Sequence, residues 1–343
     1  DVPGQNFISN GQSNVTSLLL KSEIVKFKIF KPKINNIIFS SLNLYLNLII
    51  DKRPIYIVSS RSIIGFLRDL PALMAVFFNI KVYCHIHGSD LNLLLNKKLI
   101  GNLAIILYRK VFKLIVPTEY ALKNIFNLEN INNQKVIVAN PVFFTNKQLK
   151  NIKQKKHNKE PIILWNSNLI ASKGLFNSLD AMLYVKEINN LKFRFKILGR
   201  AFDDNEMRKV QVIQKLETYL KNPWIKYQGP QSFEKAQDFI FKSDIVILPS
   251  RYVSECQPLA LIYAMQLGKI IITSSHPSII ETLGNYPAYL IKDTNSIIEI
   301  ADNLVLAIKQ INSLEKIDIK FIKEAKTRFS LSRFLYKMQK VLI

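Results

Sequence analysis

Short apolar runs alternate with segments of helical period along most of the chain, and this alternation restricts the fold more than any other feature. The runs are rich in Ile, Val and Leu and are bounded by polar or glycine-containing turns. Strands separated by helices of this length are typical of βαβ units, whose strands pair in parallel. The sequence therefore predicts an α/β fold with doubly wound parallel sheets.

The expected elements fall into two halves. Strands are predicted at Ile55–Val58, Val82–His85, Leu114–Val116 and Val136–Val138, and then at Ile162–Leu164, Phe193–Leu198, Ile225–Tyr227, Ile245–Leu248, Ile270–Thr273 and Ala288–Ile291. Helices in the first half are predicted at about Ile63–Phe78, Lys97–Val111 and Thr118–Phe126.

A polar, lysine-rich stretch without an apolar period lies between the halves, at Thr145–Glu160, and predicts a linker. We expect a Rossmann-like N-terminal domain over residues 1–144, a linker over 145–160 and a Rossmann-like C-terminal domain over 161–328. The helix over 329–343 is expected to cross back to the N-terminal domain. Because the sequence opens on Asp1 rather than Met, we expect a trimmed N-terminus that lacks the first strand.

Composition excludes several classes of protein. With 48% hydrophobic and 21% charged residues, the 343-residue chain is neither disordered nor fibrous. Its two cysteines, Cys84 and Cys256, are too few for a disulfide framework or a metal cluster and fit a reducing, cytoplasmic setting. No apolar stretch has the length of a transmembrane helix, and no secretory signal opens the sequence.

The chain is strongly basic, with 48 Lys and Arg against 25 Asp and Glu and a formal net charge of +23. The first 160 residues carry 23 of those basic residues and eight of the acidic ones. This asymmetry indicates a polyanionic partner, either nucleic acid or an anionic membrane surface. No nucleic-acid-binding module is recognisable, and the aromatic residues are scattered. Lys97–Val116 mixes Leu and Ile with basic residues and suits a membrane interface, or else an ordinary amphipathic helix followed by a core strand.

Ligands of doubly wound sheets bind beyond the carboxyl ends of the strands. After the strand at 162–164, Ser167 and Asn168 form a polar turn and Lys173 precedes a helix, an arrangement that suits a phosphate or an ordinary cap with a solvated lysine. After the strand at 193–198, Gly199 and Arg200 permit either close backbone approach to a ligand or a plain turn. The adjacent acids Asp203 and Asp204 are expected to be solvated rather than bound to a metal.

Two further candidate side chains lie just before a helix or just after a strand. Glu255 lies just before a helix that begins near Leu259, so it either faces a substrate hydroxyl or caps the helix. His87 follows the strand that ends at His85, and it either donates to a sugar hydroxyl or phosphate or is a satisfied turn residue. His85 is expected to point the opposite way, into the core.

Taken together and in this order, these segments resemble the glycosyltransferases of the GT-B fold, specifically the large retaining family 4. SNLIASKG at Ser167–Gly174 resembles a variant of that family's phosphate-binding GRLxxxKG motif, and FKILGR at Phe195–Arg200 resembles the strand and turn that follow. The segment from Ser243 to Ser274 is similar to its donor-site signature. HIHGSD at His85–Asp90 and VIVANPV at Val136–Val142 resemble landmarks of its acceptor domain.

The resemblance implies two Rossmann-like domains that face a cleft, a nucleotide-diphosphate sugar donor, and no metal or other cofactor. By position, Lys173 would neutralise the leaving diphosphate, Glu255 would contact hydroxyls of the donor sugar, and His87 would lie near the reacting centre. A flexible polar loop ahead of a helix at about Val15–Leu20 would approach the diphosphate. The donor-binding residues implied are Gly11, Gln12, Ser13, Ser167, Asn168, Gly199, Arg200, Pro258, Leu259, Ala260 and Tyr263.

The sequence departs from the family pattern at three places. Tyr263 replaces a second glutamate, which lies eight residues after the first and accepts hydrogen bonds from the ribose; a phenol can also form such bonds. Asn168 replaces an arginine. Pro277 and Ser278 replace a pair of glycines ahead of Glu281.

We therefore expect a cytoplasmic, peripheral glycosyltransferase of hexosyltransferase type on the inner face of the plasma membrane. It would move a sugar to a glycan or lipid-linked acceptor in the synthesis of a bacterial surface polysaccharide such as lipopolysaccharide. The alternative is a non-catalytic GT-B subunit that binds a partner or a sugar nucleotide without turnover, which Tyr263 favours and Lys173, Glu255 and His87 disfavour. Nucleic acid is not an expected partner.

Overall fold

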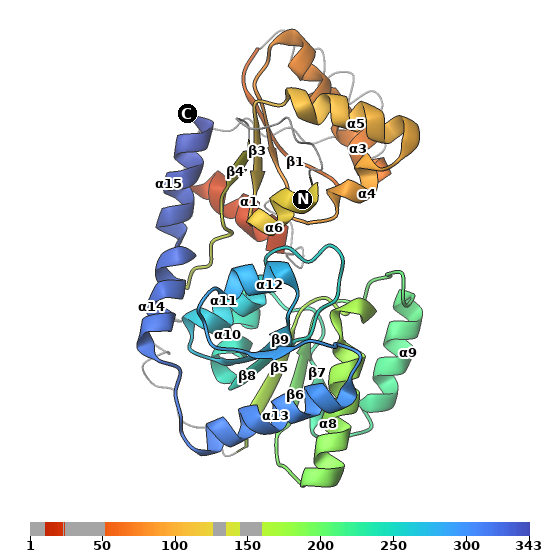
Figure 1. Ribbon diagram of the computed structural model, residues 1–343, viewed down its shortest axis with the longest axis vertical. Helices are drawn as coiled ribbons and strands as arrows, with labels where there is room; N and C mark the ends of the chain where they lie inside the picture. The colour runs from red at the N-terminus through yellow and green to blue at the C-terminus, as the bar shows by residue number, and fades with distance from the viewer. Residues whose placement is uncertain (1–10, 23, 25–51, 126–134, 145–159) are drawn as a thin grey trace. The chain divides into compact units, whose positions relative to one another are not determined.

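The computed structural model describes residues 11–22, 24, 52–125, 135–144 and 160–343 of the chain (Figure 1). Its strands form two parallel sheets, one of four strands and one of six. The chain divides into two compact units. The N-terminal unit contains the described residues up to Pro141 together with Leu331–Ile343, and the C-terminal unit contains those from Val142 to Ser330.

The N-terminal unit contains a small parallel sheet with the strand order β1-β2-β3-β4. Each expected strand is present to within one residue at either end, because runs of Ile, Val and Leu suit strands that are buried under helices. The strands are β1 (Ile55–Val58), β2 (Val82–His85), β3 (Lys113–Val116) and β4 (Lys135–Ile137). The connecting helices are α3 (Ile63–Met74), η2 (Ala75–Phe78), α4 (Leu91–Leu95), α5 (Lys98–Lys110) and α6 (Glu119–Ile125).

Two helices from opposite ends of the chain share one hydrophobic cluster in this unit. They are α1 (Gly11–Lys21) and α15 (Leu331–Leu342). Leu19 of α1 and Phe334 of α15 are both buried in a cluster that also contains Ile115 of β3. The C-terminal helix therefore belongs to the same compact unit as the first half of the chain.

The expectation of a flexible loop over Gly11, Gln12 and Ser13 is wrong, because α1 already begins at Gly11. Small and polar residues are tolerated in a first helical turn, since the backbone N–H groups there need no partner within the helix. The side chains of these three residues lie outside the described part of the structure.

The C-terminal unit contains a six-stranded parallel sheet with the order β10-β9-β8-β5-β6-β7. All six expected strands are present, as β5 (Ile162–Asn166), β6 (Arg194–Leu198), β7 (Ile225–Tyr227), β8 (Ile245–Leu248), β9 (Ile270–Ser274) and β10 (Tyr289–Ile291). The helices are η3 (Ala171–Lys173), α8 (Leu175–Asn189), α9 (Lys209–Tyr219), α10 (Phe233–Lys242), α11 (Leu259–Gln266), α12 (Pro277–Leu283), α13 (Ile297–Asn312) and α14 (Ile319–Arg328). Helix α8 packs against α13, and α11 packs against α10 and α14 (Figure 1). The prediction of a doubly wound α/β fold is confirmed.

The order of the strands places a topological switch point between β5 and β8. From β5 the chain adds β6 and β7 on one side, then returns to add β8, β9 and β10 on the other side. The two connections that leave β5 and β8 therefore diverge, and a crevice opens at the carboxyl ends of these two strands. Ligand-binding residues of this unit are expected on the loops that follow β5 and β8.

Two glycines allow the loops at this edge to touch backbone to backbone. Gly174 has φ +86°, and a Cβ added there would lie 2.5 Å from the carbonyl oxygen of Pro249, in the loop after β8. Gly199 has φ +132°, and a Cβ there would lie 2.0 Å from the carbonyl oxygen of Ser167, in the loop after β5. The loops after β6, β5 and β8 therefore form one packed layer. No described helix is long and apolar enough to cross a membrane.

The contact at Gly199 predicts a large effect of a single methyl group. Gly199→Ala should lower the free energy of unfolding by about 1–3 kcal/mol more than Gly229→Ala, because the new Cβ overlaps Ser167. Gly229 is the matched control, since it also has positive φ, at +69°, but no atom within 4 Å of the added Cβ. Urea unfolding of the two variants measures the difference. Equal losses would show that backbone conformation alone, and not the contact with Ser167, requires glycine at 199.

Candidate active site

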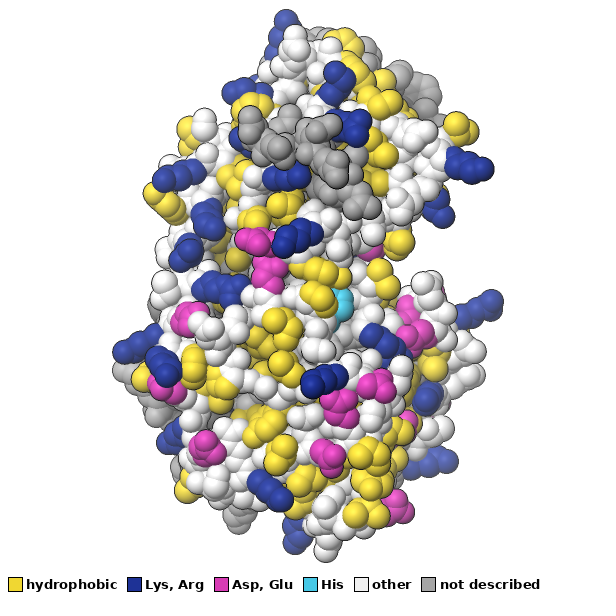
Figure 2. Space-filling view, in the orientation of Figure 1, with side chains coloured by type: hydrophobic (Ala, Val, Ile, Leu, Met, Phe, Trp, Pro, Cys, Tyr) yellow, Lys and Arg dark blue, Asp and Glu magenta, His cyan; other side chains and the backbone are white. Residues whose placement is uncertain are grey.

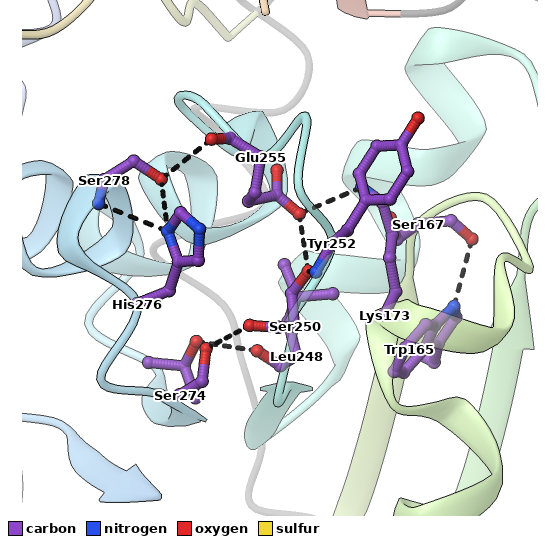
Figure 3. Close-up of polar contacts among 11 residues, drawn as sticks. Trp165, Ser167, Lys173, Leu248, Ser250, Tyr252, Glu255, Ser274, His276 and Ser278 are labelled. Atoms are coloured by element: carbon purple, nitrogen blue, oxygen red, sulfur yellow. Dashed lines mark hydrogen bonds and ion pairs between the residues drawn. The ribbon is translucent and has the colours of Figure 1, made fainter. Parts of the chain in front are cut away.

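Lys173 and Glu255 form an ion pair at the switch point (Figure 3). Lys173 ends η3 in the loop after β5, and Glu255 lies in the loop after β8. The Nζ of Lys173 is 3.1 Å from Oε2 of Glu255, and the two side chains are only 13% and 6% exposed. The same Nζ lies 5.3 Å from the centre of the Tyr252 ring. The structure thus brings together two of the three side chains predicted to be catalytic.

Hydroxyl groups from three neighbouring segments hold Glu255 in place. Ser250 donates to Oε2 of Glu255 at 2.9 Å, and Ser274 donates to the carbonyl oxygen of Ser250 at 2.5 Å. The Ser278 hydroxyl is 3.1 Å from the carbonyl oxygen of Glu255 and 2.9 Å from Nδ1 of His276 (Figure 3). Both ends of Glu255 are therefore fixed before any ligand binds.

The N-terminus of α11 carries backbone donors next to this pair in sequence. Pro258 is the N-cap of α11, and the N–H groups of Leu259 and Ala260 make no hydrogen bond with the described residues. Such N–H groups and the positive end of the helix dipole attract an anion. The predicted role of residues 258–260 in phosphate binding is compatible with this geometry.

Ser167, Asn168, Gly199 and Arg200 lie in the packed layer formed by the loops after β5 and β6. The carbonyl oxygen of Ser167 accepts a hydrogen bond from Nε1 of Trp165 at 3.0 Å, and that of Arg200 accepts one from the N–H of Leu169 at 2.9 Å. The side chain of Arg200 is exposed. The space beside Gly199 is filled by Ser167, so glycine is required here for contact between the two loops rather than to admit a ligand.

Asp204 has a structural role. Its carboxylate accepts hydrogen bonds from the backbone N–H groups of Ser172 at 2.8 Å, Met207 at 2.8 Å and Glu206 at 3.0 Å. Partial burial opposes ionisation, but these hydrogen bonds prevail and lower the pKa of Asp204. The carboxylate thereby ties the loop after β6 to the segment that carries Lys173. Among the described residues, no three His, Cys, Asp or Glu side chains are grouped as they would be in a metal site.

Tyr263 faces an aromatic cluster instead of the ion pair. Its hydroxyl donates to the carbonyl oxygen of Phe143 at 3.3 Å and lies 3.4 Å from the N–H of the same residue. The rings of Phe144 and Phe233 meet its ring edge to face, at 5.3 and 5.8 Å between centroids. Only 4% of Tyr263 is exposed, and its hydroxyl is engaged with the protein backbone.

His87 lies in the N-terminal unit and stacks on His85. The ring centroids are 4.0 Å apart, and Tyr56 places its hydroxyl 2.7 Å from Nδ1 of His85. The expectation that His85 points away from His87 is wrong, because residues i and i+2 of an extended segment face the same side. Its expected burial is correct. Gly11, Gln12 and Ser13 also belong to this unit, whereas the other predicted site residues belong to the C-terminal unit.

Burial determines the ionisation of the two stacked histidines. It lowers the pKa of His87 to about 4, although the Asn140 side chain acts in the opposite sense and the charge of Arg61 adds to the lowering. The pKa of His85 is also well below its usual range because of burial and the neighbouring His87 ring. Both rings are therefore neutral near pH 7, and neither supplies a positive charge to a ligand.

Three residues of the site, Ser250, Ser274 and His276, are not singled out by the sequence pattern. Each of these residues ends a strand of the C-terminal sheet or follows it closely. Their position just after predicted strands could therefore have marked them as candidate site residues. His276 also caps α12, with Nδ1 3.3 Å from the N–H of Ser278. Their role depends on contacts between loops that are distant in sequence, which a strand pattern does not reveal.

The model of one protein family, described as glycosyl transferases group 1, matches residues 146–328. The chain belongs to this family. The matched segment includes the whole six-stranded sheet and the Lys173–Glu255 pair, so this glycosyltransferase carries its candidate site within the part that defines the family. No curated protein matches the sequence.

Solved structures of glycosyltransferases share the fold. A glycosyltransferase from Rickettsia africae is 15% identical with a TM-score of 0.68, and the match covers 98% of this chain and 95% of that one. HepE from Anabaena in complex with UDP and glucose is 12% identical with a TM-score of 0.71, over 95% and 88%. The UDP-forming trehalose-phosphate synthase from Burkholderia xenovorans is 11% identical with a TM-score of 0.62, over 95% and 79%. The fold is GT-B, as predicted.

The lowered pKa of the half-buried His87 predicts a loss of stability in mild acid. Its pKa of about 4 in the folded state lies below the ordinary value of 6.5, so between these two pH values the unfolded chain binds more protons. The contribution of neutral His87 is complete above pH 6.5 and disappears as the pH falls towards 4. Melting temperatures measured across this range should therefore fall less steeply for His87→Gln than for the wild type. Parallel curves would show that His87 is not buried in its neutral form.

Proposed function

We propose that this glycosyltransferase transfers a sugar from a nucleotide-diphosphate donor, with retention of anomeric configuration, to a glycan or lipid-linked acceptor. The Lys173–Glu255 ion pair at the switch point is the observation that carries this proposal. It is a cation and an anion held side by side, next in sequence to two helix N-termini. A donor with a negative diphosphate and a hydroxyl-rich sugar matches these charges.

The chemistry follows from the charges of the two side chains. As the bond between the sugar and the diphosphate breaks, negative charge grows on the leaving oxygen, and the ammonium of Lys173 would stabilise it. The N–H groups of Leu259 and Ala260 would add oriented donors. The Glu255 carboxylate, an acceptor only, would bind hydroxyls of the sugar. Lys173 supplies the positive charge in this scheme, so we propose no resident metal or other cofactor.

The donor class has further support from structures with the same fold. HepE from Anabaena was crystallised with UDP and with UDP-glucose. UDP is therefore the first nucleotide to test on this chain. We further propose that His87 of the N-terminal unit acts near the reacting centre as a neutral imidazole.

The cellular setting is also a proposal. The excess of basic residues in the first 160 positions favours an anionic surface as partner. We propose a cytoplasmic enzyme, peripheral on the inner face of the plasma membrane, that builds a bacterial surface polysaccharide such as lipopolysaccharide. A lipid-linked acceptor would be presented at that surface.

Lys173 and Glu255 should differ in which step they affect. Lys173→Met should weaken binding of UDP, or of GDP or ADP if the donor base differs, by about 10- to 100-fold, because a charge-assisted contact is lost. Glu255→Gln should leave nucleotide affinity nearly unchanged but slow sugar transfer by about 100-fold, because its contacts are to the sugar. Calorimetry with the nucleoside diphosphates and a transfer assay with the corresponding nucleotide sugar measure both effects.

Lys209→Met and Glu217→Gln are matched controls on α9, where both side chains are exposed, and they should behave as wild type. Wild-type rates in both site variants would refute the proposed site. Nucleotide binding without transfer to any acceptor would instead support the non-catalytic alternative.

The environment of Tyr263 gives a separate prediction. Tyr263→Phe should lower the free energy of unfolding by about 0.5–1.5 kcal/mol through loss of the hydrogen bond to Phe143. Affinity for the nucleoside diphosphate should stay the same, because the hydroxyl is engaged with the protein. Unfolding in urea and calorimetry test the two parts. A drop in nucleotide affinity of about tenfold or more would mean that the phenol turns to bind the donor ribose.

A further inference from the structure

Two helices of the N-terminal unit expose apolar side chains that the proposed reaction does not use. On α3, Ile64, Leu67 and Met74 lie on one side at helical spacing, and Ile64 is 84% exposed. On α5, Leu99, Leu103 and Ile106 form a similar stripe, and Leu99 is 86% exposed. Together these six side chains are called the α3–α5 face below.

The two stripes lie on neighbouring helices. Helix α3 packs against α5, and both connect strands of the same sheet, so the two helices are neighbours in one layer. The Nζ of Lys110, at the end of α5, stands 5.6 Å above the ring of Phe77 in η2, which directly follows α3. Groups of exposed apolar side chains on neighbouring elements commonly mark interaction sites.

The segment that carries the α3–α5 face is strongly basic. Residues 61–113 contain eight Lys and Arg but only two Asp. Asp69 is paired with Arg68 at 2.8 Å, and Asp90 is paired with Arg61. The formal net charge of this segment is therefore +6. Figure 2 shows hydrophobic side chains among Lys and Arg at the upper end of the molecule, where α3 and α5 lie in Figure 1.

These charges discriminate between partners. A second copy of the chain would bring like charges together at the contact, which opposes association. An anionic bilayer offers both parts that this surface needs, namely an apolar interior for the Leu and Ile side chains and phosphates for Lys and Arg. Lysine and arginine can bury their methylene stems and keep their charged ends at the headgroups.

We propose that the α3–α5 face docks the protein on an anionic lipid bilayer, with its apolar side chains at headgroup depth and the surrounding lysines and arginines on lipid phosphates. This docking proposal rests on the proposed function and deepens it, because it assigns the membrane contact to particular residues. The binding itself can be measured without donor or acceptor.

Co-sedimentation with vesicles tests the apolar part. The wild-type protein should bind vesicles of mixed phosphatidylglycerol and phosphatidylcholine and should not bind pure phosphatidylcholine. Ile64→Ser combined with Leu99→Ser should weaken binding by about tenfold or more. Ile188→Ser combined with Val210→Ser is the matched control, because these residues of the C-terminal unit are 65% and 63% exposed, and it should bind as wild type.

The charged part has its own variants. Neutralising Lys98, Arg109 and Lys110 to Gln should weaken binding by at least about tenfold, and added salt should weaken wild-type binding as well. Neutralising the exposed residues Lys192, Lys209 and Lys323 should change little. The proposal would be overturned if the wild-type protein bound neutral and anionic vesicles equally, or if both sets of charge variants lost binding equally. It would also be overturned if the variants altered only a monomer–dimer equilibrium in sedimentation.

Nucleotide binding separates this proposal from the proposed function. All variants of the α3–α5 face should keep wild-type affinity for the nucleoside diphosphate. If every variant still binds vesicles as the wild type does, and nucleotide binding and transfer are intact, the docking surface alone is overturned. Vesicle binding that follows the prediction, without any nucleotide binding by the wild-type protein, would overturn the proposed reaction alone.

Discussion

The ion pair between Lys173 and Glu255 joins loops that leave the sheet on opposite sides of its switch point, and the candidate site depends on this junction. The two loops can meet only because Gly174, next to Lys173, lets the backbone touch Pro249, in the same loop as Glu255. A side chain at 174 would overlap the Pro249 carbonyl and push the loops apart. The topology of the sheet and one glycine thus determine where the two charges meet.

A nearly buried ion pair is an expensive way to stabilise a protein, because both charges lose their hydration. Here the hydroxyl of Ser250 partly replaces water around Glu255, and Ser274 holds Ser250 in turn. In the proposed reaction the benefit would be preorganisation, because charges that are fixed in advance need not be reoriented when charge develops on a leaving group. The hydrogen-bonded serines would then contribute to that reaction although none of them needs to contact a substrate.

The sequence predicted the strands of both sheets because apolar, β-branched runs that alternate with helical segments are typical of parallel strands buried under helices. It also singled out Lys173 and Glu255, since both follow a strand and precede a helix. It did not reveal the stacking of His85 on His87 or the contacts of Ser250 and Ser278, which depend on side-chain geometry. The start of α1 at Gly11 was missed because small polar residues suit both a loop and a first helical turn.

Tyr263 occupies a position where the resemblance implies a ligand contact, and the structure uses it for packing. The position is buried beside Phe143, Phe144 and Phe233, where a charged carboxylate without a partner would be costly. A phenol fits, because its ring packs and its hydroxyl satisfies the backbone of Phe143. Since Tyr263 lies one turn into α11, this cluster anchors the helix whose first N–H groups, at Leu259 and Ala260, stay available to an anion. The tyrosine therefore satisfies its own hydroxyl and packs the helix on which the proposed anion contacts depend.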